Sequence, residues 1–216
     1  MHFIVDKERM IIFGWSAKCG SSHLKKIIKF LNFNNSEIKD KMSLPSDIWN
    51  YTTLIFIRNP YKRLVSGFLD KYNESGEMRK RWKQKELTFT TFVEELINKK
   101  WKMVDFHHFT PQTTEKFNIK IMNPKEIKCF DIENINYNYI QYLYKRNIPL
   151  RLIEFKGLHK RKKYDSCITH NVFDLNIDDY YENNIDLKYF YNAELKKKIY
   201  NFYKNDFFFF KNIFNI

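Results

Sequence analysis

Residues 11–28 read IIFGWSAKCGSSHLKKII, and the other predicted elements of the chain are arranged around them. It contains a short apolar run suited to a β-strand, then a loop of small residues, then apolar residues at helical spacing such as Leu24 and Ile28. The free N–H groups in the first turn of such a helix, together with the helix dipole, favour a bound anion. The stretch therefore predicts a strand, a phosphate-binding loop and a helix, the last over residues 21–33.

The position of the lysine separates this loop from the P-loop of nucleotide-binding proteins. In the P-loop pattern G-x-x-x-x-G-K-[ST], the lysine directly follows the last glycine and precedes a hydroxyl residue that binds magnesium. Here Lys18 comes two residues before Gly20, and Ser21 and Ser22 follow that glycine. A P-loop kinase-like phosphotransferase is therefore an alternative that the pattern disfavours.

A second strand and helix follow further along the chain. Residues 53–57, TLIFI, form a β-prone apolar run that ends at Arg58, and Asn59 and Pro60 suit the cap and the first position of a helix. Strands that alternate with helices favour a parallel sheet, in which the carboxyl ends of the strands meet at one edge. Lys18 and Arg58 each follow a strand, so we expect them at the same edge.

The pattern along the whole chain is that of an α/β protein. A third strand is expected at residues 126–132, a helix capped by Thr88 before it, and a last helix at residues 192–203. The predicted fold is three-layered and P-loop-like, with a central, mainly parallel sheet flanked by helices. A chain of 216 residues suits one domain, so residues 1–216 are predicted to form a single domain.

Several segments resemble sequence motifs of the sulfotransferases. Residues 58–68, RNPYKRLVSGF, closely resemble the R-D-P-x-x-R-x-x-S-x-[YF] element that holds the 3′-phosphate of 3′-phosphoadenosine 5′-phosphosulfate (PAPS). Residues 18–22 then resemble the companion loop for the 5′-phosphosulfate. Residues 108–112, HFTPQ, resemble the H-W-x-P-Q motif of the membrane-associated carbohydrate sulfotransferases, and residues 203–207, YKNDF, resemble the closing Y-x-x-D-[FY] of the family.

The resemblance implies a PAPS-dependent sulfotransferase without the membrane anchor of the carbohydrate enzymes. It would transfer a sulfuryl group to an acceptor hydroxyl, and the H-x-x-P-Q motif favours a carbohydrate. Lys18 would supply positive charge to the leaving group, and Arg58 and Ser66 would bind the 3′-phosphate. The 5′-phosphate would be held by Cys19, Gly20, Ser21 and Ser22. No metal is implied. Asn59 in place of aspartate and Phe109 in place of tryptophan depart from the family pattern.

His108 is the first choice for the general base, because an imidazole titrates near neutral pH and can accept the proton of a hydroxyl. Three other residues remain candidates for this role: His107, Asp105 and Glu133. Glu133 also suits the N-terminus of a helix after the third strand, where a carboxylate interacts favourably with the dipole.

The composition indicates an anionic partner. The chain has 38 Lys and Arg residues against 25 Asp and Glu, a formal net charge of +13, which a phosphate-bearing donor and an acidic glycan acceptor would both suit. The densest basic run, residues 159–163, lies in no nucleic-acid-binding motif, which argues against nucleic acid as a partner. In the sulfotransferases that the chain resembles, a late loop closes over the donor, so the resemblance implies that Lys160, Arg161 or Lys162 of this run contacts it. The non-enzymatic alternative is a basic protein, or a degenerate sulfotransferase, that binds nucleic acid or acidic glycan.

Cysteine usage and hydropathy indicate a soluble protein of the cytoplasm. Cys19, Cys129 and Cys167 are odd in number and widely spaced, which fits neither a disulfide framework nor a zinc site and favours a reducing compartment. The first residues carry charges where a signal peptide needs an apolar core. No apolar run reaches membrane-spanning length, so no transmembrane segment is expected.

Overall fold

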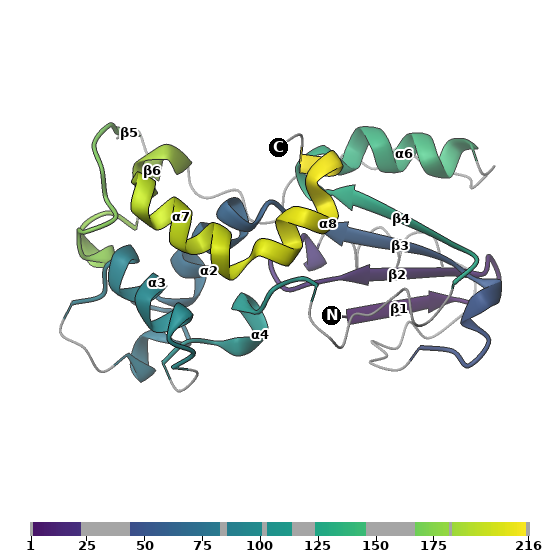
Figure 1. Ribbon diagram of the computed structural model, residues 1–216, viewed down its shortest axis with the longest axis horizontal. Helices are drawn as coiled ribbons and strands as arrows, with labels where there is room; N and C mark the ends of the chain where they lie inside the picture. The colour runs from purple at the N-terminus through teal and green to yellow at the C-terminus, as the bar shows by residue number, and fades with distance from the viewer. Residues whose placement is uncertain are drawn as a thin grey trace. The chain divides into compact units, whose positions relative to one another are not determined.

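A computed structural model describes residues 2–22, 44–82, 86–100, 103–113, 124–145, 167–181 and 183–214 (Figure 1). The chain divides into two compact units. The first unit comprises Met1–Arg58, Gln112–His159 and Phe210–Ile216, and the second comprises Asn59–Pro111 and Lys160–Phe209.

The first unit is built on a four-stranded sheet. Its strands, in spatial order, are β1 (His2–Asp6), β2 (Ile11–Trp15), β3 (Thr52–Ile57) and β4 (Glu126–Asp131). β1 is antiparallel to β2, whereas β2, β3 and β4 run parallel to one another. The helical elements bounded within the described part of this unit are η1 (Ile48–Asn50), η4 (Ile132–Asn134), α6 (Ile135–Lys145) and the C-terminal part of α8 (Lys204–Phe214), and a further helix begins at Ser21. The predicted α/β class with a mainly parallel sheet is therefore confirmed.

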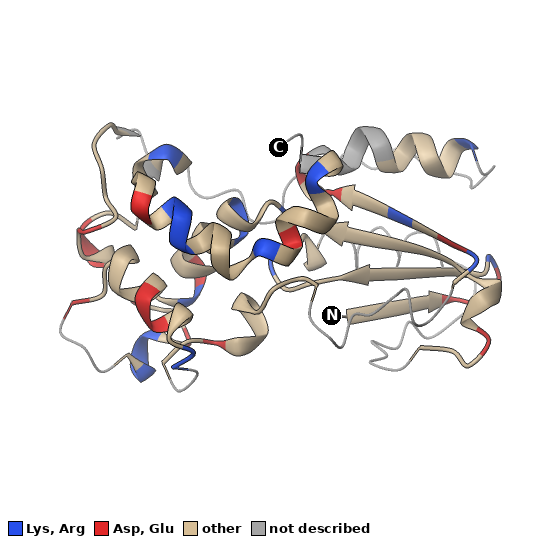
Figure 2. Cartoon of the chain, in the orientation of Figure 1, with Lys and Arg blue, Asp and Glu red and all other residues tan. Residues whose placement is uncertain are grey.

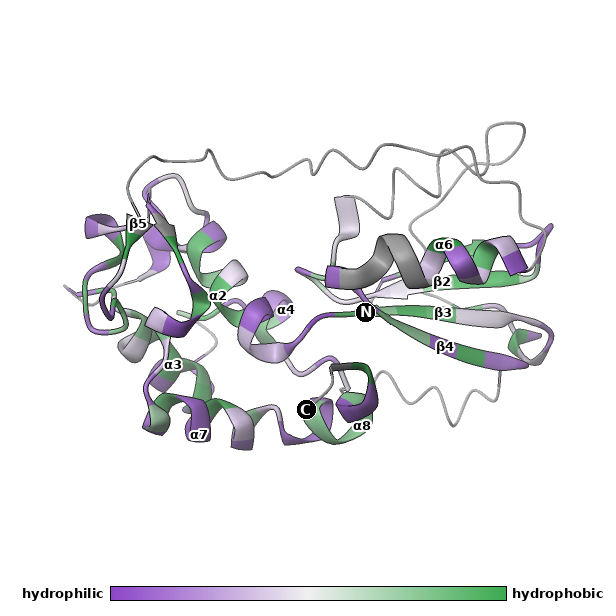
Figure 3. Ribbon diagram, turned by 90° about the horizontal axis from the view of Figure 1, so that it is seen from above, coloured by the Kyte–Doolittle hydropathy of each residue, from purple (hydrophilic) through white to green (hydrophobic). Residues whose placement is uncertain are grey.

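Both faces of this sheet are covered, as expected for parallel strands whose side chains are apolar on both sides. On one face, alternate residues of the strands pack against Tyr139 and Leu143 of α6. On the other face, Ile55 and Ile57 of β3 pack against Phe210 of α8. The sheet thus has helices on both sides, as predicted, and Figure 3 shows its strands coloured mostly as hydrophobic.

Three of the four strands lie close to their predicted positions. The sequence predicts strands at about residues 10–14, 52–58 and 126–132, and β2, β3 and β4 occupy these places. The sequence pattern does not predict β1. This strand pairs with β2 across a turn at residues 7–10, whose charged residues separate two apolar runs too short to show a clear period.

The second unit is mainly helical. The elements that the structure describes in it are α2 (Pro60–Lys71), η2 (Arg79–Arg81), α3 (Phe89–Ile97), α4 (Phe106–Phe109), η5 (Ile177–Asp179), η6 (Leu187–Phe190), α7 (Ala193–Phe202), the N-terminal part of α8, and the short parallel strands β5 (Cys167–Ile168) and β6 (Asn184–Ile185). The predicted caps are present. Oδ1 of Asn59 accepts the N–H of Tyr61 at the start of α2, and Thr88 forms a capping box with Thr91 at the start of α3.

The core of the second unit is rich in aromatic side chains. One face of α3 is fully buried and consists of Phe89, Phe92, Val93 and Leu96. The predicted C-terminal helix is observed as α7, with Leu195 and Ile199 buried in the same core. These apolar faces of α3 and α7 therefore pack in the core of the unit.

Charged residues avoid the centre of the sheet in the first unit. β2 and β3 contain none, whereas α7 in the second unit carries both signs of charge (Figure 2). Lys18 and Arg58, the cations expected to bind an anion, therefore follow these strands and do not lie within them. Among the helices within the described residues, none is both long enough and apolar enough to cross a bilayer.

Candidate functional site

The loop that follows β2 has the backbone conformation of an anion-binding nest. Lys18 has a φ of 64° and Gly20 a φ of 75°, whereas the residues beside them do not have positive φ values. Alternation of this kind turns successive N–H groups toward a common point, where they can bind an anion. Glycine adopts such a conformation at little cost, but it is uncommon for a residue such as lysine. The N–H of Cys19 donates to the carbonyl of Ser16 at 3.1 Å and closes the loop.

A helix begins directly after this loop. Ser21 and Ser22 are helical, and the rest of the helix predicted at residues 21–33 lies outside the described residues. The N–H groups in the first turn of a helix have no partner within the helix and carry the positive end of its dipole. Lys18 and both serines are at least partly exposed. The loop thus combines backbone donors, one cation and two hydroxyls.

Arg58, which follows β3, lies at the same edge of the sheet. β2 and β3 are parallel, with Trp15 paired to Phe56, so the residues that follow Trp15 and Ile57 leave the sheet at one edge. Lys18 is three residues beyond the end of β2, and Arg58 directly follows β3. The parallel pairing confirms the expectation that both residues lie at this edge.

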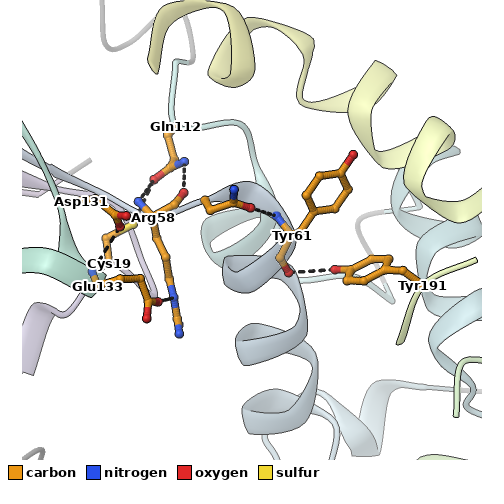
Figure 4. Close-up of polar contacts among 8 residues, drawn as sticks. Cys19, Arg58, Tyr61, Gln112, Asp131, Glu133 and Tyr191 are labelled. Atoms are coloured by element: carbon orange, nitrogen blue, oxygen red, sulfur yellow. Dashed lines mark hydrogen bonds and ion pairs between the residues drawn. The ribbon is translucent and has the colours of Figure 1, made fainter. Parts of the chain in front are cut away.

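The side chain of Arg58 is held by Glu133, which follows β4. Nε of Arg58 donates to Oε1 of Glu133 at 2.9 Å, as Figure 4 shows, and the two side chains are 22% and 32% exposed. Among the residues that the structure describes, none hydrogen-bonds the two terminal nitrogens of Arg58. A guanidinium group oriented in this way can offer both nitrogens to a phosphate. Glu133 therefore positions Arg58.

Gln112 connects the two strand ends (Figure 4). Its Oε1 accepts the N–H of Arg58 at 3.0 Å and the thiol of Cys19 at 3.0 Å, and its Nε2 donates to the carbonyl of Arg58 at 2.9 Å. Gln112 is only 2% exposed. The sequence marks Gln112 as part of the H-x-x-P-Q motif but gives no sign of these contacts, whose partners are 54 and 93 residues away.

In the second unit, His108 is paired with Asp105. Oδ1 of Asp105 accepts the N–H of His107 at 2.9 Å, and Oδ2 lies 2.5 Å from Nδ1 of His108. Burial raises the pKa of Asp105, but the hydrogen bond and charge of His108, with two backbone N–H groups, bring the pKa below its ordinary value. Because Nδ1 of His108 faces this carboxylate, Nε2 is the nitrogen that can take a proton.

These contacts rank the four candidates for the general base. Asp105 has a lowered pKa, which makes its carboxylate a weaker proton acceptor. Glu133 is ion-paired with Arg58. The side chain of His107 is exposed and meets the ring of His108 edge-on, with centroids 5.0 Å apart. His108, oriented by a carboxylate, has the contacts that suit a base best.

Two buried side chains form hydrogen bonds with the backbone of the segment that carries the H-x-x-P-Q motif. Arg63, which is 2% exposed, donates Nη1 to the carbonyl of Thr110 at 2.8 Å. The hydroxyl of Tyr203 donates to the carbonyl of Phe109 at 2.6 Å, and burial raises the pKa of Tyr203, so the hydroxyl keeps its proton. Arg63 comes from the element assigned to the 3′-phosphate and Tyr203 from the closing motif. The sequence predicts neither contact.

The other predicted site residues lie partly within and partly outside the described part of the chain. Ser66 lies in the second turn of α2 and is partly exposed. Its assignment to the 3′-phosphate stays a prediction, and so does that of residues 19–22 to the 5′-phosphate. The basic run at residues 159–163 lies outside the described residues.

The described part of the chain offers no cluster of three or more His, Cys, Asp and Glu side chains that could hold a metal ion. Neither Cys19 nor Cys129 forms a disulfide. Burial raises the pKa of Cys129 to about 11, so its thiol stays protonated at neutral pH and is a weak nucleophile.

Comparison with known proteins assigns the family. A family model described as "Sulfotransferase family" matches residues 1–212. Neither the curated proteins nor the solved structures gave a match. The matched range contains the loop after β2, the contacts of Arg58 and Gln112, and the closing motif. Since the match covers nearly the whole chain, the protein belongs to the sulfotransferase family.

Proposed function

We propose that this protein transfers a sulfuryl group from PAPS to a hydroxyl of a carbohydrate acceptor. Membership of the sulfotransferase family supports sulfotransfer in general. The observation that carries the proposal is the connection, through Gln112, of the loop that contains Lys18 with the strand end that carries Arg58. A donor with phosphate groups at two positions needs two anion sites on one edge, and this edge supplies a pair of suitable groups.

The residues at this edge fit such a donor. The N–H groups of the loop and of the helix start, with the hydroxyls of Ser21 and Ser22, would hold the 5′-phosphate. The terminal nitrogens of Arg58 would hold the 3′-phosphate, and Ser66 would add a hydroxyl. Lys18 would offset the negative charge that builds up on the leaving phosphate as its bond to sulfur breaks.

His108 would act on the acceptor as the general base. As the acceptor oxygen forms its bond to sulfur, Nε2 of His108 would take the hydroxyl proton. The ionised Asp105 would hold Nδ1–H and stabilise the imidazolium that results. The electron pair of the broken S–O bond goes to the leaving phosphate, so the transfer is balanced with one proton on His108.

Two further observations support the proposed acceptor and compartment. Residues 108–112 resemble the motif of the carbohydrate sulfotransferases, and the excess of basic residues suits an acidic glycan. The thiol of Cys19 donates a hydrogen bond to Gln112, and oxidation would remove that donor. We therefore propose a reducing compartment, the cytoplasm, as the place where the protein works.

Transfer of labelled sulfate from PAPS to a panel of glycans and simple alcohols tests the proposal. The wild-type protein should sulfate a glycan, and His108→Ala should abolish transfer while 3′-phosphoadenosine 5′-phosphate (PAP) still binds by calorimetry. Preferential stabilisation by ATP and magnesium over PAP in a thermal-shift assay would favour the kinase alternative and refute the proposal. Salt-dependent retention of an oligonucleotide without sulfate transfer would refute it in favour of a non-catalytic binding protein.

A further inference from the structure

Arg58 lies where the hydrogen-bonding ladder of β3 ends. The parallel pairing of β3 with β4 runs as far as Ile57 and Asp131. The backbone N–H and carbonyl of the next residue, Arg58, therefore need partners other than the next strand, because unpaired backbone groups are costly when they are shielded from water. Both groups find their partner in one side chain, that of Gln112.

The side-chain amide of Gln112 takes the place of a peptide group of a neighbouring strand, because it both accepts a hydrogen bond from Arg58 and donates one to it. Oε1 accepts the N–H of Arg58 at 3.0 Å, and Nε2 donates to the carbonyl of Arg58 at 2.9 Å. The same Oε1 accepts the thiol of Cys19, which belongs to the anion-binding loop, at 3.0 Å. Both lone pairs of this oxygen are thus in use, and the residue is only 2% exposed, so water competes little for these bonds.

We propose that Gln112 is a positioning residue that fixes the separation between the two phosphate sites of the donor. The inference rests on the proposed function, which assigns one phosphate to the loop that contains Cys19 and the other to Arg58. A ligand with phosphates at both positions spans the two sites at once, so its affinity depends on a separation that is set before it binds. A ligand with one phosphate uses one site and does not depend on that separation.

Few residue types can make this set of contacts. Asparagine is one methylene shorter, so it cannot reach both partners from the same backbone position. Glutamate has no N–H for the carbonyl of Arg58 and adds a negative charge beside the anion-binding loop. A protonated glutamate regains a donor as its O–H group. Gln112→Glu should therefore recover part of the lost affinity as the pH falls.

Calorimetry with PAP, adenosine 5′-monophosphate and adenosine 3′-monophosphate tests the inference. For Gln112→Ala, we expect the Kd of PAP to rise about tenfold or more, and the Kd of either monophosphate to change by less than about threefold. Leu143→Ala removes a fully buried side chain from the same unit, and it should lower Tm without changing the ratio of the Kd for PAP to that for the monophosphates. Gln141→Ala makes the same chemical change at an exposed position of α6 and should match the wild type.

Each outcome decides a different point. If Gln112→Ala weakens all three ligands equally, or none of them, the inference is overturned and the donor assignment stands. If the wild-type protein does not bind PAP, the proposed function fails and this inference fails with it. If Gln112→Ala does not fold, Gln112→Glu provides the test. The Kd of PAP for this variant is compared with that of the wild type at each pH, and the difference between them should become smaller toward about pH 5. A loss that does not vary with pH would overturn the inference.

Discussion

Arg58→Ala should lower the affinity for PAP while leaving the fold intact. The side chain of Arg58 bonds Glu133 through Nε in a partly exposed pair. Pairs of this kind contribute about 0–1 kcal/mol, because water hydrates each partner when the other is removed, so the free energy of unfolding should fall by less than about 1 kcal/mol. The bonds between the backbone of Arg58 and Gln112 do not involve the guanidinium group and should remain.

The expected loss of PAP affinity is larger than the loss of stability. A hydrogen bond from a charged donor contributes about 1.5–3 kcal/mol, which corresponds to roughly 10- to 150-fold in Kd. Both terminal nitrogens of Arg58 can contact one phosphate, which puts the expected effect in the upper part of this range. Arg58→Lys keeps the charge but loses the planar fork, so it should retain only part of the affinity.

Calorimetric titration with PAP and with adenosine 5′-monophosphate measures this effect directly. The monophosphate lacks the 3′-phosphate, so its Kd should change by less than about threefold in Arg58→Ala. Arg79→Ala is the matched control, because Arg79 forms a similar pair with Asp178, with side chains 25% and 33% exposed. This control removes an equivalent ion pair from the second unit and should leave the Kd of both ligands unchanged.

Two results would refute the reasoning about Arg58. An equal loss of affinity for PAP and for the monophosphate would mean that Arg58 does not recognise the 3′-phosphate. A fall in the free energy of unfolding of more than about 2 kcal/mol in urea would mean that the pair with Glu133 is chiefly structural, contrary to its exposure.

Three further substitutions test other parts of the molecule. Lys18→Ala should lower kcat about a hundredfold and raise the Kd of PAP by less than about tenfold; full turnover in the labelled-sulfate assay would exclude Lys18 from the reaction. Gly67→Ala would put a Cβ 2.6 Å from Cε1 of Phe109 and should cost about 1–3 kcal/mol in urea unfolding, whereas an unchanged midpoint would mean that the ring can shift. The lowered pKa of Asp105 means that its carboxylate stabilises the fold above the ordinary pKa of aspartate, and that this stabilisation is lost as the pH falls through the lowered value. Asp105→Asn should therefore destabilise the protein most near neutral pH and least in acid, and an effect that does not vary with pH would contradict this.

The sheet and the edge at which Lys18 and Arg58 lie can be predicted from local sequence. β2 and β3 are short, β-prone apolar runs, and each ends where the residue type changes, at Ser16 and at Arg58. The helical segments between strands favour parallel pairing, which brings the ends of neighbouring strands to one edge. The placement of Lys18 at the same edge as Arg58 follows without any knowledge of long-range contacts.

The hydrogen bonds made by the side chains of the motifs could not be predicted in the same way. Gln112, Arg63 and Tyr203 each bond to the backbone of residues that are 47 to 94 positions away. A backbone N–H or carbonyl is chemically the same at every position, so no pattern of residue types identifies it as the partner of a given side chain. The motifs mark these three residues, but only the folded chain gives their partners.

The two departures from the family pattern keep the physical role of the residues that they replace. Asn59 caps α2 through Oδ1, which accepts the N–H of Tyr61 at 3.0 Å, as an aspartate would. This cap carries no charge, so it puts no anion next in sequence to Arg58, whose proposed ligand is itself an anion. Phe109 is 1% exposed and packs on Gly67, where the absence of a side chain leaves room for an aromatic ring. A decayed relative would be expected to lose the cap and the aromatic contact where its sequence changes, and because both survive, the substitutions favour a working transferase over a degenerate one.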